Sequence, residues 1–181
     1  MSHDLPYRAS VRLPGFDYSS PNWYYVTICT KNRQQLFVGA DYHPPVNITY
    51  TPIGLIAKQY WQEIPHHYPS ASLDQFVIMP NHIHGVIIIK QKIRADDNPP
   101  LHKGSGTLGA IVRGYKIGVT KWCRENSSIY DIWQRNYYEH IIRDEGELAH
   151  IRQYIKDNPR NWNMDKLYVG ADYHPPELLQ I

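Results

Sequence analysis

The sequence has little cysteine, little phenylalanine and no long apolar run. Its 2 cysteines, Cys29 and Cys123, predict neither a disulfide framework nor a thiolate zinc site. The first residues lack an apolar signal segment, and no stretch is long enough to cross a bilayer. We therefore expect a cytoplasmic protein that has no contact with membranes.

A strong net charge is also missing. The formal charge is +2 at pH 7, so a prediction of nucleic-acid binding has to depend on local clusters of charge. Aromatic residues are abundant instead, with 15 Tyr and 5 Trp against 3 Phe. Because tyrosine and tryptophan carry polar groups, they suit a surface that stacks on bases as well as a core.

Apolar periodicity predicts alternating strands and helices. Strands are expected at 23–30, at 73–90 as a hairpin turning at Pro80 and Asn81, within 129–143, and more weakly at 46–50. Helices are expected at 52–64, 107–125 and 146–158.

We expect one domain at 23–162, preceded by an irregular arm at 1–22 and followed by a tail at 163–181. The segment VGADYHPP occurs at 38–45 and again at 169–176, and we have no physical account of this identity.

Two histidines, His82 and His84, lie in the apolar run FVIMPNHIHGVIIIK. Alternate side chains of a strand share a face, so both imidazoles project from one side while Ile83 packs on the other. Two adjacent imidazoles form half of a metal site. By itself, the pattern fits polar residues on a solvated sheet face equally well.

The helix expected at 107–125 has an apolar side and an almost purely cationic side. Glu125 is its only acid, whereas solvated helix faces usually mix acids with bases. We therefore predict contacts with DNA phosphates from this helix and from cations of neighbouring segments. The predicted DNA-binding residues are Lys31, Arg33, Lys92, Arg94, Arg113, Lys116, Lys121 and Arg124.

The last expected helix carries His150, Tyr154 and Asn158 along one ridge, because they are spaced by four residues. Tyrosines in amphipathic helices mostly lie at the edge of a core, so this spacing alone predicts no nucleophile. Together with the histidine pair it makes Tyr154 a candidate, and His150 becomes a candidate to support it.

Several segments resemble one protein family. VIMPNHIHGVIII resembles the His-hydrophobic-His motif of single-tyrosine DNA transposases of the IS200 type, and IWQRNYYEHIIRDEGELAHIRQYIKDNP resembles the final segment of REP-associated tyrosine transposases. YYVTICTKNRQQLF and LGAIVRGYKIGVTKW are similar to that family too, so the resemblance covers residues 20–162 in order. It implies an HUH-type catalytic domain of the α+β, ferredoxin-like class. In that fold an antiparallel sheet of four to five strands holds the histidines on a central strand, and we expect the helices to cover one face.

The resemblance also implies roles for individual residues. His82 and His84 would bind a divalent metal ion, Mg²⁺ or Mn²⁺, with Asn158 as third ligand, and Tyr154 would be the nucleophile. The implied enzyme cuts and rejoins single-stranded DNA near hairpins in transposition or recombination, through a 5′-phosphotyrosine intermediate. The chemistry suits these residues, because a phenol with a pKa of about 10 needs a metal ion or a base to become nucleophilic.

Alternatives remain open at this point. A non-catalytic protein that binds hairpin DNA would keep the fold, although His82, His84 and Tyr154 together argue against it. A histidine-triad hydrolase would need a third histidine where Val86 stands. The tyrosine could serve its own chain or a partner subunit, so a monomer and a homodimer both fit.

Overall fold

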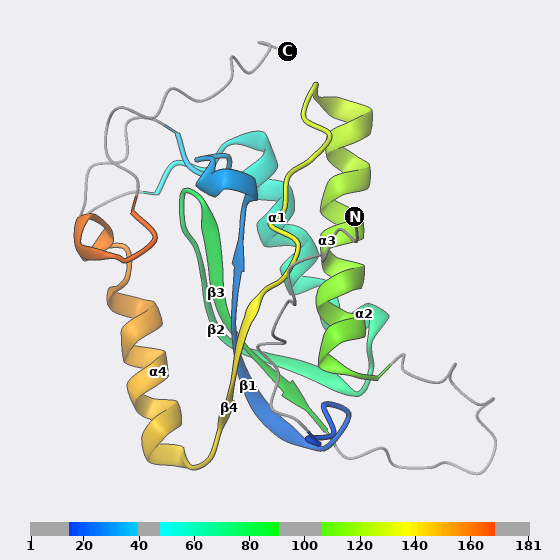
Figure 1. Ribbon diagram of the computed structural model, residues 1–181, viewed down its shortest axis with the longest axis vertical. Coiled ribbons are helices and arrows are strands. Elements are labelled where there is room, and N and C mark those ends of the chain that lie inside the picture. The colour runs from blue at the N-terminus through cyan, green and yellow to red at the C-terminus, as the bar shows by residue number, and fades with distance from the viewer. Residues whose placement is uncertain (1–14, 40–47, 91–105, 169–181) are drawn as a thin grey trace, which may run out of the picture.

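The computed structural model describes residues 15–39, 48–90 and 106–168 (Figure 1). Within these residues, four strands form one antiparallel sheet in the order β2-β3-β1-β4. The strands are β1 (Asn22–Cys29), β2 (Ala71–Ile78), β3 (His82–Ile89) and β4 (Tyr138–Ile142).

Helices connect these strands in a repeated pattern. The first connection contains η1 (Lys31–Arg33), α1 (Pro52–Gln62) and α2 (Ile64–His67), and the second contains α3 (Leu108–Asn126). After β4 come α4 (Glu145–Asp157) and the short turn η2 (Trp162–Met164). The βαββαβ order with the first and third strands central is ferredoxin-like, which confirms the predicted α+β class and the central position of the histidines.

Each long helix begins at a side-chain cap that is visible in the sequence. Thr51, Thr107 and Asp144 accept hydrogen bonds from the backbone amides of Gly54, Ala110 and Glu147. These bonds satisfy amides that have no partner within the helix, and Pro52 loses nothing in the first turn because its nitrogen carries no hydrogen. The predicted helix starts therefore agree with the observed ones within one residue.

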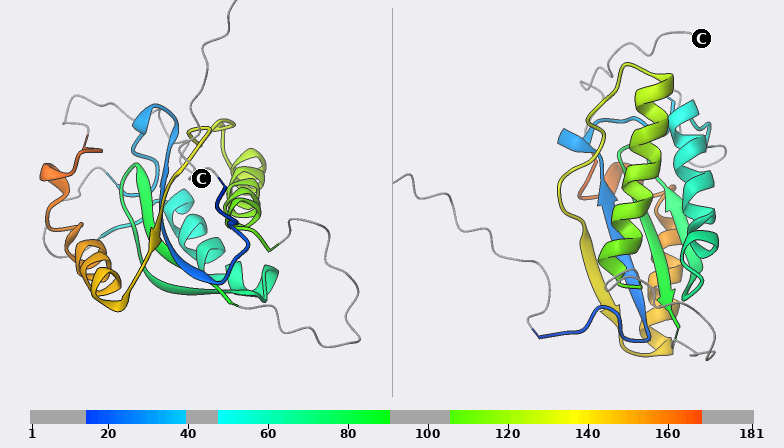
Figure 2. Two further views of the ribbon diagram at one scale, coloured as in Figure 1. Left: turned by 60° about the horizontal axis from the view of Figure 1, so that its bottom comes forward. Right: turned by 90° about the vertical axis from the view of Figure 1, so that its right-hand side faces the viewer.

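Helices cover both faces of the sheet, so the expectation that they cover one face is wrong. Figure 2 shows α1 and α3 on one side of the sheet and α4 on the other. The reason lies in β3, where seven of the eight residues of HIHGVIII are buried. A strand that is buried on both faces needs an element packed against each of them.

The core between the sheet and α1 and α3 leaves no room at two glycines. A Cβ atom at Gly54 would lie 1.9 Å from the Phe37 carbonyl oxygen, and one at Gly85 would lie 2.3 Å from Trp61 Cζ2. Gly85 thus lets the indole of α1 lie directly on β3, and Gly54 lets α1 approach the segment that follows β1. A smaller core on the other face joins α4 to the sheet through Val77, Val86, Ile142, Leu148 and Ile155.

Some expected features differ or lie outside the described residues. Where a helix end was predicted at 64, the chain forms the extra turn α2. Of the weak strand at 46–50, the described part shows only a bridge between Tyr50 and Val38. Lys92, Arg94 and most of both VGADYHPP copies lie outside the described residues. Among the described helices, none is both long and apolar enough to cross a membrane.

Candidate functional site

The two histidines share one face of β3, as the strand period predicts. Their rings point towards α4, and the two Nε2 atoms are 2.9 Å apart. His82 is 0% exposed and His84 is 3% exposed, so both rings are shielded from bulk water. The alternative of a solvated polar face therefore does not apply to this pair.

The outer nitrogen of each ring is held by a neighbour. Asn81 donates its Nδ2 hydrogen to the Leu167 carbonyl at 2.8 Å, which directs its Oδ1 towards His82 Nδ1, also at 2.8 Å. His82 must therefore donate through Nδ1, and its Nε2 lone pair is directed into the site. His84 Nδ1 contacts the hydroxyls of Tyr25 at 2.7 Å and Thr27 at 2.9 Å. Such outer contacts orient imidazoles that bind metal ions.

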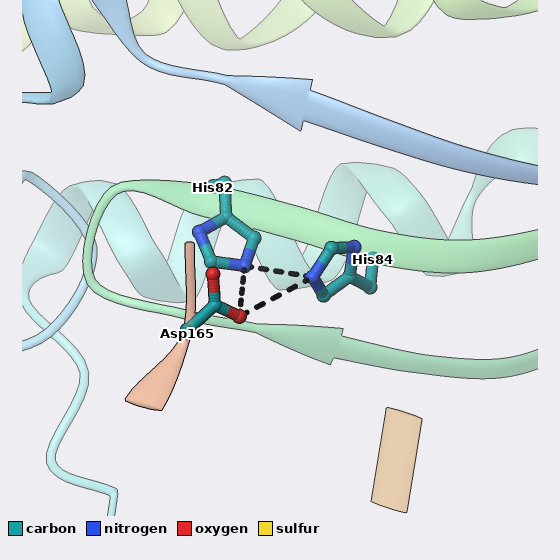
Figure 3. Close-up of side chains that lie close together, drawn as sticks. All are labelled: His82, His84 and Asp165. Atoms are coloured by element: carbon teal, nitrogen blue, oxygen red, sulfur yellow. Dashed lines mark hydrogen bonds and ion pairs between the residues drawn. The ribbon is translucent and has the colours of Figure 1, made fainter. Parts of the chain in front are cut away.

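A carboxylate that the sequence did not indicate completes this cluster. Figure 3 shows Asp165 facing both histidines, with its Oδ2 atom 3.9 Å from each Nε2 atom. The Leu167 amide donates to its other oxygen at 2.6 Å. Asp165 belongs to the segment NWNMDKL, which carries no recognisable motif and lies beyond the domain end predicted at 162. Asp165 reaches the histidines only because the chain turns back after α4.

Asn158, the expected third ligand, lies beside Asp165. Its Nδ2 atom donates to Asp165 Oδ2 at 3.0 Å, and its buried Oδ1 atom has no hydrogen-bond partner among the described residues. The amide thus holds the carboxylate in place while an oxygen acceptor stays available. Its role as a ligand stays a prediction.

Tyr154 lies next to the histidine pair in the same chain. Its hydroxyl is 3.5 Å from His84 Nε2, and its side chain is 49% exposed. The phenol is thus close to the candidate metal site and open to a substrate. His150 is exposed and lines a pocket together with Tyr154, but within the described residues it makes no hydrogen bond to Tyr154.

The charges of the site favour neutral histidines and an ionised aspartate. Burial lowers the pKa of both histidines, and repulsion by His84 lowers that of His82 further. Burial pushes the pKa of Asp165 up, but its interactions with His84, the Leu167 amide and Asn158 outweigh burial, so this pKa lies below its usual range. Burial and the Asp165 charge raise the pKa of Tyr154, which is therefore a protonated phenol at neutral pH.

This donor set fits a divalent cation. His82, His84 and Asp165 each offer one ligand atom, and the three atoms lie within 4.8 Å of one another. Neutral imidazole nitrogens and a carboxylate oxygen bind Mn²⁺, Fe²⁺, Co²⁺, Ni²⁺ and Zn²⁺. The three side chains can therefore hold a metal ion without rearranging the fold.

A pocket of about 1130 Å³ opens beside these residues. We call it the active-site pocket, and its lining includes Tyr25, His84, Tyr138, Tyr154 and Asp165. Tyr138 is 55% exposed and lies edge-on to Tyr25. Exposed aromatic rings beside a polar cluster can stack on unpaired bases.

Within the described residues, the predicted DNA-binding cations do not form one surface. Arg113, Lys121 and Arg124 are exposed on α3, which covers the sheet face opposite to the histidines. Lys116 instead donates to the carbonyls of Gln134 at 2.8 Å and Asn136 at 3.1 Å, and burial lowers its pKa to about 8. Lys116 thus supports the loop before β4, while Lys31 and Arg33 lie in η1, just beyond the end of β1.

Two proteins of Haemophilus influenzae are similar to the chain. One, an uncharacterised protein, is 45% identical over 174 residues, which cover 91% of this chain and 95% of that protein. The other, named as a REP-associated tyrosine transposase, is 27% identical over 149 residues, which cover 79% of this chain and 73% of that protein. No protein-family model matches the chain.

A solved structure shares the fold. It shows a REP-associated tyrosine transposase bound to a REP hairpin, with a TM-score of 0.59 and 18% sequence identity. The match covers 86% of this chain and 76% of that one. The likeness therefore extends over most of the ferredoxin-like domain described above.

Proposed function

We propose that the chain, which is similar to REP-associated tyrosine transposases, is a member of that family and a metal-dependent enzyme that cuts and rejoins single-stranded DNA near hairpins. One observation carries this proposal. The Tyr154 hydroxyl lies 3.5 Å from His84 Nε2, so a candidate nucleophile lies next to a candidate metal site within one chain. This arrangement is what phosphoryl transfer to tyrosine requires.

In the proposed site, His82, His84 and Asp165 hold a divalent metal ion, Mg²⁺ or Mn²⁺, and Asn158 fixes the carboxylate. The bound ion would supply polarisation of the scissile phosphate and a positive charge that favours the phenolate. Thr27 and Tyr25 orient His84, and Asn81 orients His82, so the chain itself fixes where the ion and the phosphate can lie.

The proposed reaction transfers a DNA 5′ phosphate to Tyr154. The phenolic oxygen attacks phosphorus as its proton leaves to solvent, and the bond from phosphorus to the 3′ oxygen breaks. That oxygen takes up a proton, which gives a 5′-phosphotyrosine and a free 3′-OH. Attack by a 3′-OH reverses these steps, so rejoining needs no nucleotide cofactor. Because Tyr154 is half exposed, DNA can reach it without any opening of the fold.

The proposed substrate is a DNA hairpin with single-stranded flanks. The transposase of similar fold was solved with a REP hairpin, and the active-site pocket of this chain presents aromatic rings to unpaired bases. The complete set of groups in one chain makes a monomer sufficient for cleavage. This arrangement favours action of the tyrosine within its own chain over its donation to a partner.

A covalent adduct tests the proposal. We expect a labelled hairpin oligonucleotide with single-stranded flanks to become attached to the wild-type protein in the presence of Mn²⁺ and to survive a denaturing gel. Tyr154→Phe should form no adduct, because it lacks the attacking oxygen. Tyr138→Phe is the matched control, since it removes an exposed phenol from the same pocket and should keep the adduct.

Two outcomes would contradict this proposal. An equal yield of adduct from Tyr154→Phe would show that another group is the nucleophile. Binding of hairpins by the wild-type protein without any adduct, on every hairpin tested, would support the non-catalytic DNA-binding alternative.

A further inference from the structure

A second pocket lies beyond the end of β1, and the reaction proposed above does not use it. Its volume is about 570 Å³, within the range of roughly 300–1000 Å³ that small-molecule sites occupy. We call it the η1 pocket, and its lining residues are Lys31, Asn32, Arg33, Asp131, Trp133, Gln134 and Arg135.

The walls of the η1 pocket are fixed by the backbone. The Lys31 amide donates to the Ile132 carbonyl at 2.7 Å, and the Gln134 amide donates to the Cys29 carbonyl at 3.0 Å. Thr30 and Trp133 form a bridge between these bonds, so the pairing pattern of the sheet continues past β1. The backbone hydrogen bonds therefore fix the distance between the segment that follows β1 and the segment that contains Trp133.

The turn at η1 adopts a conformation that side chains disfavour. Asn32 and Arg33 have φ angles of 52° and 57°, in the left-handed region that glycine usually occupies. Backbone strain of this kind persists where the surrounding structure imposes it, and it often marks a functional site. Here the turn places Arg33 between the η1 pocket and the segment of Asp165, because Arg33 Nη1 donates to the Lys166 carbonyl at 3.2 Å.

The charge of the η1 pocket is positive. Lys31 forms an ion pair with Asp131, which leaves the guanidinium groups of Arg33 and Arg135 to set the local field. Arg135 is exposed and forms no ion pair or side-chain hydrogen bond with the described residues. A guanidinium group presents a planar fork of donors that matches a phosphate group.

The Trp133 ring and a residue shared with the active-site pocket indicate which kind of ligand the η1 pocket binds. Trp133 is one of the lining residues, and the orientation of its ring is fixed by a hydrogen bond from its Nε1 to the Lys116 carbonyl at 3.1 Å. Gln134 lines both the η1 pocket and the active-site pocket. A chain of nucleotides that leaves one pocket can therefore enter the other directly.

We propose that the η1 pocket binds one unpaired nucleotide of the single-stranded DNA that runs through the active-site pocket. Arg33 and Arg135 bind its phosphate, and its base lies on Trp133. The inference rests on the proposed function for the identity of the strand. It assigns to Arg135 and Trp133 a role that the sequence did not indicate.

Binding of single-stranded DNA without cleavage tests this inference. The experiment measures fluorescence anisotropy of labelled (dT)10 with the Tyr154→Phe protein in EDTA, over a series of salt concentrations. Adding Arg135→Gln should weaken binding by roughly tenfold and make the slope of log K against log salt shallower by about 0.7, as expected for one lost phosphate contact. Arg143→Gln is the matched control, because Arg143 is exposed at the opposite end of β4 and should change affinity less than about twofold.

Two results would overturn the inference. An equal loss in Arg135→Gln and Arg143→Gln would show general electrostatics, and an equal loss for a duplex of the same length would show that no unpaired nucleotide is bound. These results are independent of the adduct experiment. If the wild-type protein forms the adduct but Arg135→Gln binds (dT)10 normally, the η1 pocket inference fails alone. If no adduct forms but Arg135→Gln weakens binding selectively, the pocket remains and the cleavage proposal fails.

Discussion

The two faces of the sheet are built differently from the same strands. The face towards α1 and α3 is apolar apart from Glu139, which is paired with Val26 and buried. Its core includes Tyr24, Val26, Ile28, Ile83 and Ile87. The face towards α4 has a smaller apolar core, in which Val86 and Ile142, near the start of β1, meet Leu148 and Ile155. The other half of this face carries the two histidines and the groups that orient them.

One face of the sheet therefore stabilises the fold, while the other holds the residues of the candidate site. A continuous core on one face buries enough apolar surface to hold the strands in register. The other face is then free to keep polar side chains in positions that help stability little. Substitutions in the first face should therefore change the free energy of unfolding, whereas substitutions in the polar half of the second should change metal and DNA binding.

The largest expected effect on stability comes from the core between the sheet and helices α1 and α3. Gly54→Ala should lower the free energy of unfolding by about 3 kcal/mol or more, because the added Cβ atom would meet the backbone oxygen of Phe37 at 1.9 Å. Gly118→Ala is the matched control, since its Cβ atom meets only the flexible Tyr60 ring at 3.3 Å. It should change stability by less than about 1 kcal/mol, because the gain in helix propensity offsets the contact. Urea denaturation measures both, and equal effects would contradict the close approach of α1 to Phe37.

A smaller effect should come from titration of the histidine pair. In the metal-free protein the pKa values of His82 and His84 lie below the value of about 6.5 in the unfolded chain, so below pH 6.5 the unfolded state binds protons first. Stability should therefore fall as the pH drops from 6.5 to 5.5, by up to about 1.0 kcal/mol for each histidine.

Urea denaturation in EDTA between pH 7.5 and 5.5 measures this dependence. The window lies well above the pH at which carboxylates titrate. His82→Asn should remove about half of the pH dependence. A flat profile for the wild-type protein would contradict the burial of neutral imidazoles at this end of the sheet.

The last prediction concerns metal binding instead of stability. Asp165→Asn keeps an oxygen that can accept from the Leu167 amide, but it loses the negative charge and the oxygen that accepts from Asn158. Its affinity for Mn²⁺, measured by calorimetry, should fall at least about tenfold because the anionic ligand is lost.

Asp157→Asn provides the comparison, since Asp157 lines the same pocket but is bonded to Gln153 and lies outside the cluster of ligand atoms. It should bind Mn²⁺ like the wild-type protein. Unchanged affinity in Asp165→Asn would exclude Asp165 as a ligand.

The sequence alone predicted the features that depend on local patterns of residues. The strand period placed His82 and His84 on one face, and the caps at Thr51, Thr107 and Asp144 located the helix starts. The family resemblance supplied the order of strands and helices, which local patterns do not determine. It also carried the prediction that Tyr154 is the nucleophile. The structure places Tyr154 beside the histidines, and the adduct experiment tests its role.

What the sequence did not indicate depends on the path of the chain between elements. Asp165 reaches the histidines because the chain turns back after α4, and nothing in NWNMDKL indicates that turn. Lys116 belongs to a helix face that looked uniformly cationic, yet the loop before β4 supplies two carbonyls to its ammonium group. Contacts of this kind are set by tertiary packing, so helix periodicity alone misassigned the environment of Lys116.

The placement of Tyr154 beside the histidines of its own chain has a consequence for stoichiometry. In the proposed reaction each chain has one attacking oxygen, so a chain that has reacted carries one DNA 5′ end and is occupied until that end is transferred. A mobile segment of DNA has two ends. Excising it would therefore require either two chains acting together or two successive cycles of one chain, and the number of adducts formed per segment would tell these routes apart.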